Sequence, residues 1–350
     1  MYDLYGQNFI NAIRSLINAR PVSGNKELVT RCPFCGDSKN PSHAHFYISV
    51  PQNDMEISFY NCKKCPAAGI LSDDVLRKLN INDSSLLIAI NKHNSEVLKT
   101  PRYNTIKNTD IYNLKNTYIR EDKNNEYKLN YINNRIGSNF SYEDILSLKI
   151  FLNLYDVLNQ NNLDLTRHKN ITDQLDIFFI GFVSYDNSFA NMRKVTDKEL
   201  YKSVNKRYIN YNLTGKIDNN KNYYIIPTSI DLTSNDPIKI HIAEGPFDIL
   251  SIYYNLNNCN RFNNIYISCG GKGYYNALSF ILQEIGMINF ELHYYPDRDI
   301  DDYFINKLIN AIGMLSTDIY IHRNSFGNEK DYGVPRERIK DNIFKVENYG

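Results

Sequence analysis

Residues 238–245 read IKIHIAEG, and residues 294–299 read YYPDRD. Each stretch is a short, mostly apolar run that ends at acidic residues, as a buried strand does where it reaches the edge of a sheet. In an open parallel sheet, ligands bind in the crevice beyond the carboxyl ends of the strands. We therefore expect the carboxylates of Glu244, Asp297 and Asp299 to converge at one such edge.

Clustered carboxylates repel one another unless they share a cation. Carboxylate and water oxygens suit Mg²⁺ or Mn²⁺, the ions with which proteins handle phosphate groups. The single residue between Asp297 and Asp299 lets two carboxylates of one loop share a metal ion. These residues predict a site for metal-dependent phosphoryl transfer.

Further acidic residues are candidates for the same edge. Asp331 follows the last predicted strand, so we expect it near the D-x-D pair. Asp248 completes an E-G-x-x-D pattern with Glu244, and it could cap a helix, support the site from behind or bind the metal directly. Asp301 and Asp302 are predicted to cap a helix.

The pattern around these acids is strand–helix–strand, repeated from residue 237 onwards. Strands are predicted at 238–243, 264–268, 290–295 and 318–322, and the clearest helix is predicted at 274–285. Pro246 suits the first turn of another helix. Strands that alternate with helices in this way predict a parallel α/β sheet.

A glycine-rich segment, Gly270-Gly271-Lys272-Gly273, separates a predicted strand from the predicted helix. Its N–H groups could face a phosphate, or the segment could simply form a tight turn. The chain contains no G-x-x-x-x-G-K-[ST] motif, so an ATP-driven motor of that type is not predicted.

Two C-x-x-C pairs, Cys32-Pro-Phe-Cys35 and Cys62-Lys-Lys-Cys65, are separated by 26 residues. Four thiolates in this arrangement are the usual ligands of one structural zinc ion. Disulfides are the alternative, but they are unexpected in a chain without an export signal. Segments 43–49 and 55–61 read as strands, which predicts a β-rich zinc ribbon. His43 and His45 are alternative ligands or nucleic-acid contacts.

The composition is that of a globular protein, with 42% hydrophobic and 23% charged residues. A chain of 350 residues has room for two or three domains. The N-terminus predicts an amphipathic helix that ends near Pro21 and lacks the layout of a signal peptide. No apolar run approaches the roughly 20 residues that cross a bilayer. We therefore expect a cytoplasmic protein with no membrane partner.

The net charge of +1 gives no sign of the basic stripe that nucleic-acid enzymes usually carry. A nucleic-acid surface would have to come from local clusters that include Arg193, Lys206, Arg207 and Lys216.

The middle of the chain changes character three times. Segment 91–125 is polar and reads as a linker. Segment 127–163 has helical patterning, with one face formed by Ile145, Leu148, Leu152 and Tyr155. Short β-like runs follow in 177–230.

Taken in order, several motifs resemble those of DNA primases of the bacterial and phage type: CPFCG (32–36), CKKC (62–65), RYIN (207–210), EGPFD (244–248), PDRD (296–299) and KDYG (330–333). Such enzymes join an N-terminal zinc ribbon to an RNA polymerase domain that contains a Toprim fold. The resemblance covers nearly the whole chain and implies an α+β multidomain protein. Its implied parts are a zinc ribbon (1–95), a linker (96–125), a mixed α/β first part of the polymerase domain (126–236) and a C-terminal α/β Toprim subdomain with a parallel sheet (237–350).

The resemblance also assigns roles by position. Glu244 matches the catalytic Toprim glutamate, Asp297 and Asp299 match its D-x-D pair, and all three are implied metal ligands, with Asp331 and Asp248 as further ligands. Binding of nucleotide or template is implied for Arg193, Lys206, Arg207, Lys216 and Lys272. The chain departs from the family in having Asp301-Asp302 where many members have Ala-Gly, and in lacking Ser-Pro after Asn210.

A primase uses ribonucleoside triphosphates to synthesise short RNA primers on single-stranded DNA by metal-dependent nucleotidyl transfer. The resemblance implies one structural Zn²⁺, catalytic Mg²⁺ or Mn²⁺, and a separate replicative helicase as partner, in the cytoplasm of a bacterium or a phage-infected bacterial cell. Two alternatives stay open: a Toprim enzyme that cleaves DNA, such as a nuclease or topoisomerase, and a zinc-ribbon DNA-binding or recombination protein. Ribonucleotide-dependent product formation distinguishes the primase from both.

Overall fold

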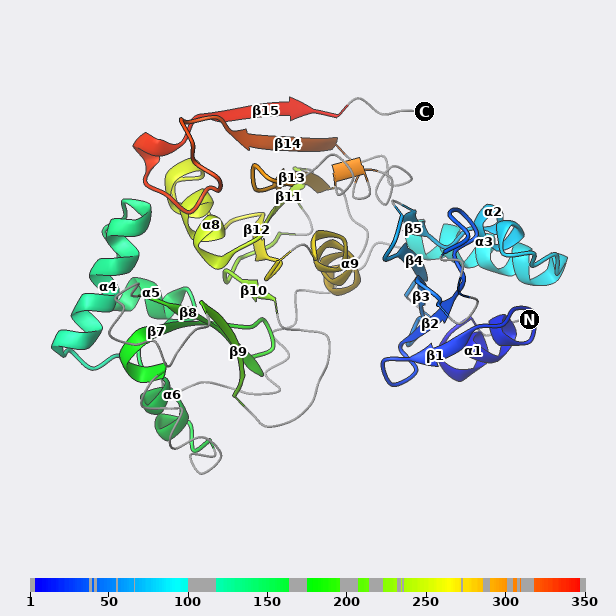
Figure 1. The fold of residues 1–350 in the computed structure, drawn as a ribbon, viewed down its shortest axis with the longest axis horizontal. Helices are drawn as coiled ribbons and strands as arrows, with labels where there is room; N and C mark the ends of the chain where they lie inside the picture. Colours follow the sequence, from blue (N-terminus) through cyan, green and yellow to red (C-terminus); the bar gives the residue numbers. More distant parts are fainter. Residues whose placement is uncertain are drawn as a thin grey trace.

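The computed structural model describes residues 4–37, 40, 43–54, 56–65, 67–99, 118–163, 175–195, 207–213, 223–231, 234, 236–271, 273–285, 290–300, 305–306, 309 and 318–346. Within them the fold is mixed α/β, and its strands form three sheets (Figure 1). None of the described helices has both the length and the apolar character that crossing a membrane requires.

The first sheet is five-stranded, antiparallel throughout, and follows the order of the chain. Its strands are β1 (Arg20–Val22), β2 (Glu27–Thr30), β3 (Phe46–Ser49), β4 (Phe59–Cys62) and β5 (Ala68–Ile70). The predicted strands at 43–49 and 55–61 correspond to β3 and β4.

Three helices accompany this sheet, α1 (Gly6–Arg14), α2 (Asp73–Lys78) and α3 (Ser84–Lys99), drawn in blue to cyan in Figure 1. The expectation that the first helix reaches Pro21 is wrong, because α1 ends at Arg14 and Pro21 lies in β1. Proline is tolerated in β1 because this strand forms an edge of the sheet. Phe9 of α1 packs in the same core as Ile48 of β3.

The predicted linker is partly helical. Helix α3 continues to Lys99, and α4 (Lys123–Ile136) begins before the predicted end of the linker. Asp122 caps α4, because its carboxylate accepts hydrogen bonds from the backbone N–H groups of Asn124 and Asn125, at 3.0 and 2.9 Å. The central part of the predicted linker, residues 100–117, lies outside the described residues.

The second sheet is antiparallel, in the order β6 (Ile150–Phe151), β7 (Phe179–Val183), β8 (Phe189–Lys194), β9 (Tyr208–Asn212). The helical face predicted within 127–163 is not continuous, because β6 separates α5 (Tyr142–Ser147) from α6 (Leu154–Gln160). Lys149 marks the break with a φ of 58°. Ile145, Leu148 and Leu152 are buried, whereas Tyr155, predicted to share their face, is exposed.

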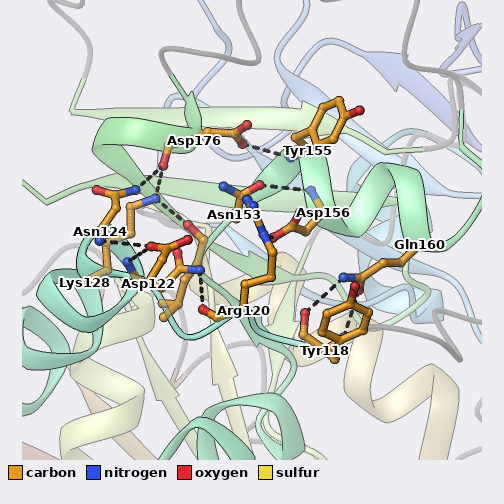
Figure 2. A network of polar contacts seen from close by, with 12 residues as sticks. Tyr118, Arg120, Asp122, Asn124, Lys128, Asn153, Tyr155, Asp156, Gln160 and Asp176 are labelled. Atoms are coloured by element: carbon orange, nitrogen blue, oxygen red, sulfur yellow. Dashed lines mark hydrogen bonds and ion pairs between the residues drawn. The ribbon is translucent and has the colours of Figure 1, made fainter.

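A network of polar contacts joins α4 to the segment around α6 (Figure 2). The ammonium group of Lys128, buried in α4, donates hydrogen bonds to the backbone carbonyls of Leu152 and Asp176. Arg120 donates to Asp156 at 2.7 Å, and the Asp176 carboxylate accepts from the N–H of Tyr155 at 2.9 Å. Burial lowers the pKa of Lys128 to about 8, so these carbonyls compensate a costly buried amine.

The third sheet has six strands in the order β10-β12-β11-β13-β14-β15. They are β10 (Tyr224–Ile225), β11 (Ile238–Ala243), β12 (Asn264–Ser268), β13 (Phe290–Tyr295), β14 (Asp318–Asn324) and β15 (Asp341–Lys345). The four central strands are parallel, as predicted, and the edge strands β10 and β15 are antiparallel to their neighbours. Strand β10 joins this sheet although the predicted boundary at residue 237 places it in the preceding part.

Helices lie on both faces of this sheet. Helix α8 (Pro246–Ser251), extended by the π-helical turn η3 (Ile252–Leu256), covers one face, and α9 (Tyr274–Ile285) covers the other. A short 3₁₀ helix, η4 (Arg336–Arg338), precedes β15. Neighbouring residues of β11 pack into different hydrophobic cores: Ile242 packs on the α9 side and Ala243 on the α8 side. The core on the α8 side also contains Phe182 of β7, so it connects the second sheet to the third.

Candidate functional site

The four cysteines of the C-x-x-C pairs lie close together. The sulfur atoms of Cys32, Cys35, Cys62 and Cys65 are all within 4.8 Å of one another, and those of Cys32 and Cys65 are 3.6 Å apart. The first pair follows β2, and the second begins at the last residue of β4. The cluster is compatible with a structural zinc site.

Polar groups around the cysteines hold their loops in place. The carboxylate of Asp37 accepts a hydrogen bond from the N–H of Cys32 at 2.7 Å and contacts Nδ1 of His45 at 2.9 Å. The Sγ of Cys62 accepts from the N–H groups of Lys64 and Cys65, at 3.3 and 3.4 Å. His45 therefore supports the loop through Asp37, and no described ligand group outside the four cysteines joins the cluster.

Without a metal ion two of these thiols, those of Cys32 and Cys65, favour their protonated form, whereas the pKa of Cys35 is lowered. Burial raises the pKa of Cys32 and raises that of Cys65 to about 11. A bound cation reverses this preference, because metal coordination stabilises thiolates and releases their protons.

Glu244 and Asp297 lie at the carboxyl edge of two neighbouring parallel strands. Ala243, the last residue of β11, is in register with Tyr295, the last residue of β13. Glu244 follows Ala243 directly, and Asp297 comes two residues after Tyr295. The carbonyl of Glu244 accepts hydrogen bonds from the N–H of Gly270 at 2.9 Å and from the hydroxyl of Ser268 at 3.2 Å. The two acids are thus brought to one edge, as the sequence predicts.

The Asp297 carboxyl is in an unfavourable place for a negative charge. Burial, followed by the nearby charges of Glu244 and Asp331, raises its pKa to about 7. Asp248 is similar, since burial, followed by the charges of Asp331 and Asp297, raises its pKa well above the usual value. Four acidic side chains at this edge therefore act on one another electrostatically.

A positive group, the ammonium of Lys330, contacts this acidic cluster. Its ammonium nitrogen lies 3.4 Å from Oδ2 of Asp297 and 3.2 Å from Oδ2 of Asp299. Asp297 is nearly buried, with 9% of its side chain exposed, whereas Asp299 is 57% exposed. Sequence reasoning missed Lys330, and the available signal was its position beside Asp331 in a loop predicted to reach the same edge.

Two arginines, also missed from the sequence, fix the loop that carries the D-x-D pair. Arg323 of β14 donates to the carbonyl of Asp297 at 3.0 Å, and Arg298 donates to the carbonyl of Gly327 at 2.7 Å. The N–H of Arg298 also donates to the carbonyl of Lys330 at 2.7 Å. The D-x-D loop and the Lys330 loop are therefore held side by side.

Asp248 acts first as a helix cap. Its Oδ2 accepts a hydrogen bond from the N–H of Gly245 at 2.8 Å, at the start of α8, and Pro246 occupies the first turn as predicted. A Cβ atom added at Gly333 would lie 2.9 Å from Oδ1 of Asp248, so glycine is needed for this close approach of the loops. Asp331 accepts from the N–H of Gly333 at 3.0 Å.

The acidic edge is more open than the cysteine cluster. Among the described residues, no three acidic side chains bring their oxygens as close together as the four sulfur atoms are. A shared metal ion would therefore require small side-chain movements, which the exposed side chain of Asp299 permits. The predicted helix caps Asp301 and Asp302 lie outside the described residues.

The predicted basic residues differ in their surroundings. The guanidinium carbon of Arg193 on β8 lies 4.2 Å from the centre of the Tyr208 ring, and the charges of Arg193, Asp248, Arg135 and Asp331 all act on the Tyr208 hydroxyl. Tyr208, against which Arg193 packs, therefore lies within electrostatic reach of Asp248 and Asp331. Arg207 is exposed. Lys206, Lys216 and Lys272 lie outside the described residues.

The glycine segment after β12 bonds to the protein itself. The N–H groups of Gly270 and Gly271 both point to the carbonyl of Glu244, at 2.9 and 3.4 Å, and both glycines have positive φ. This geometry favours the tight turn over the phosphate-binding interpretation at these two residues.

Compared with known proteins, the chain matches no protein-family model, no curated protein and no solved structure.

Proposed function

We propose that this protein is a DNA primase, in which an N-terminal zinc ribbon presents template to a polymerase domain with a Toprim-type active site. The observation that carries the proposal is the placement of Glu244 and Asp297 at the carboxyl ends of adjacent parallel strands, with Asp299 and Asp331 in the flanking loops. This is the edge at which open α/β sheets bind ligands.

The residues present suit a divalent cation. Mutually repelling carboxylates, of which Asp297 is nearly buried, favour a group that supplies positive charge. Glu244, Asp297 and Asp299 would hold the ion, which when bound would neutralise charge on the transferring phosphoryl group. Lys330 already contacts two of these acids, so it is a candidate to move toward the triphosphate once a metal takes its place.

The chain's other residues would orient the reactants. Arg193 stacks on Tyr208 close to Asp248 and Asp331, and its positive charge suits the phosphates of a nucleotide or a template strand. The cysteine cluster would give the zinc ribbon its folded form. Aromatic side chains such as Phe34, which is 39% exposed beside Cys35, could stack on template bases.

The test is primer synthesis. The purified protein is incubated with single-stranded DNA, labelled ribonucleotides and Mg²⁺ or Mn²⁺, and the products are sized on a gel. We expect short RNA products that require ribonucleotides and template, and their loss in Glu244→Gln and Asp297→Asn. Asp236→Asn is the matched control, because Asp236 is exposed at the opposite end of β11.

The outcomes separate the alternatives. Cleavage of the DNA without ribonucleotide incorporation would identify a Toprim nuclease or topoisomerase instead. DNA binding with no metal-dependent product of either kind would identify a binding or recombination protein. Full synthesis by both Glu244→Gln and Asp297→Asn would place the active site elsewhere.

A further inference from the structure

Strand β15 forms an edge of the six-stranded sheet (Figure 1). It pairs with β14 on one side, and no strand in the described part of the chain pairs with its other side. Ile343 and Phe344 are each 57% exposed, although neighbouring residues of a strand point to opposite faces. An edge strand that exposes apolar side chains is a template for pairing with another strand.

The hydrogen bonds to β14 show which backbone groups face outward. The N–H of Ser325 donates to the carbonyl of Lys340, and the N–H of Val346 donates to the carbonyl of Ile319, both at 2.9 Å. In an antiparallel ladder, residues that bond to one neighbour alternate with residues that face the other side. Residues 340, 342, 344 and 346 therefore face β14, and the backbone groups of Asp341, Ile343 and Lys345 face outward.

The sequence of β15 is complementary to itself in one antiparallel register. When Ile343 lies opposite Ile343 of a second copy, Asp341 lies opposite Lys345 of that copy, and Lys345 lies opposite its Asp341. Opposite charges on facing residues favour pairing. The same register places each outward-facing residue opposite another outward-facing residue, so the hydrogen-bonding pattern and the charges agree.

Both charged side chains are held in position within a single chain. The carboxylate of Asp341 accepts a hydrogen bond from the hydroxyl of Tyr332 at 2.6 Å and lies 2.9 Å from Nδ1 of His322. The ammonium group of Lys345 contacts Asp318 at 2.7 Å. These two side chains are therefore already ordered before a second strand pairs with β15.

We propose that β15 is the docking edge for a second copy of this chain. Two β15 strands pair antiparallel about a two-fold axis at Ile343 and join two six-stranded sheets into one continuous sheet. The contact is isologous, so it closes as a dimer. It covers Ile343 of both copies and satisfies the outward backbone groups of Asp341, Ile343 and Lys345. This inference is independent of the proposed primase activity.

Sedimentation of the full chain gives the first test. We expect the mass to rise with concentration from 40.8 kDa to twice that value. Ile343→Pro removes an outward N–H donor without removing a hydrogen bond to β14, and we expect it to remain at 40.8 kDa. A native chain that stays monomeric up to its solubility limit, or an Ile343→Pro variant that dimerises like the native chain, overturns the proposal.

A cysteine pair tests the register without relying on proline. In the proposed dimer the two residues at position 343 face each other with Cα atoms about 5.5 Å apart, within reach of a disulfide. Those at position 344 are diagonal neighbours about 7–8 Å apart. We expect Ile343→Cys to form an intermolecular disulfide under mild oxidation and the equally exposed Phe344→Cys to crosslink no more than the native chain. Equal crosslinking of both variants, or none above the native chain in either, contradicts the proposed register.

Discussion

His241 lies at the centre of the six-stranded sheet, and replacing it by glutamine should make the sheet less sensitive to acid. The residue is 1% exposed, and its ring stacks on the rings of Tyr266 and His293, with centroid distances of 4.6 and 4.8 Å. The amide oxygen of Asn264 lies 3.0 Å from Nε2 of His241. Because that oxygen only accepts, Nε2 carries the proton and Nδ1 accepts from the hydroxyl of Tyr295, at 3.2 Å. The surroundings therefore suit a neutral imidazole.

Acid destabilises the folded protein because His241 is held neutral in it. Burial, together with the charges of His322 and Lys239, lowers the pKa of His241 from 6.5 to about 3. The unfolded chain takes up a proton near pH 6.5 and the folded chain does so only near pH 3. The contribution of His241 to the stability of the fold is therefore complete above pH 6.5 and is lost as the pH falls below that value. Between about pH 8 and about pH 5 the loss amounts to about 2 kcal/mol for one such histidine.

The measurement is urea unfolding followed by hydrogen exchange and mass spectrometry. Peptides that cover β11 and β12 report on this sheet alone, apart from the sheet that carries the cysteines. We expect His241→Gln to lose about 2 kcal/mol less than the native chain between about pH 8 and about pH 5. His43→Gln, a change at an exposed histidine in the first part of the chain, is the control. Equal losses in His241→Gln and the native chain would refute the neutral buried imidazole.

Three further predictions concern the candidate sites. We expect about one zinc ion per native chain, and Cys62→Ser should release it and unfold the first sheet while leaving the third sheet intact. Elemental analysis and circular dichroism check this prediction. A native protein without zinc would contradict it. Asp297→Asn should stabilise the protein by up to about 4 kcal/mol at about pH 8. Because folding raises the pKa of Asp297, the contribution of its carboxyl group to stability is complete below pH 3.8 and is lost as the pH rises through about 7. Thermal unfolding in the presence of a chelator measures the gain, and no gain would contradict the repulsion between the carboxylates. Arg207→Ala and Arg193→Ala should each lower the salt slope of single-stranded DNA binding by about 0.7 per lost phosphate contact, and an unchanged slope in both would move the template groove away from β8 and β9.

Local patterns were sufficient for much of the third sheet. Strands at 238–243, 264–268 and 290–295 and the helix at 274–285 have the predicted bounds, because each is an apolar run of one clear period that ends at glycine, proline or acidic residues. Which strands pair at the edges of the sheet is harder to predict from a local sequence pattern. β15, with its exposed Ile343 and Phe344, has no buried face of its own and was not predicted.

The same limit explains the errors elsewhere. The first helix ends well before Pro21 because the chain must turn to bring β1 beside β2, a requirement that the apolar spacing does not contain. The helical face predicted around Leu148 breaks because β6 pairs with β7, some thirty positions further along the chain. Nonlocal pairing overrode the local period in both places.

The sequence by itself determined which residues have the chemistry: four cysteines in two C-x-x-C pairs, and acidic residues placed where strands end. Residue type and spacing along one strand or loop are local properties, so they can be read directly. Only the tertiary structure decided which charges meet. Lys330 contacts Asp297 and Asp299, and Arg193 packs on Tyr208, whose hydroxyl lies within reach of the Asp248 charge, because loops and strands distant in sequence come together. Burial, which raises the pKa of Asp297 and lowers that of His241, depends on how helices cover the sheet, and that covering is a property of the whole fold.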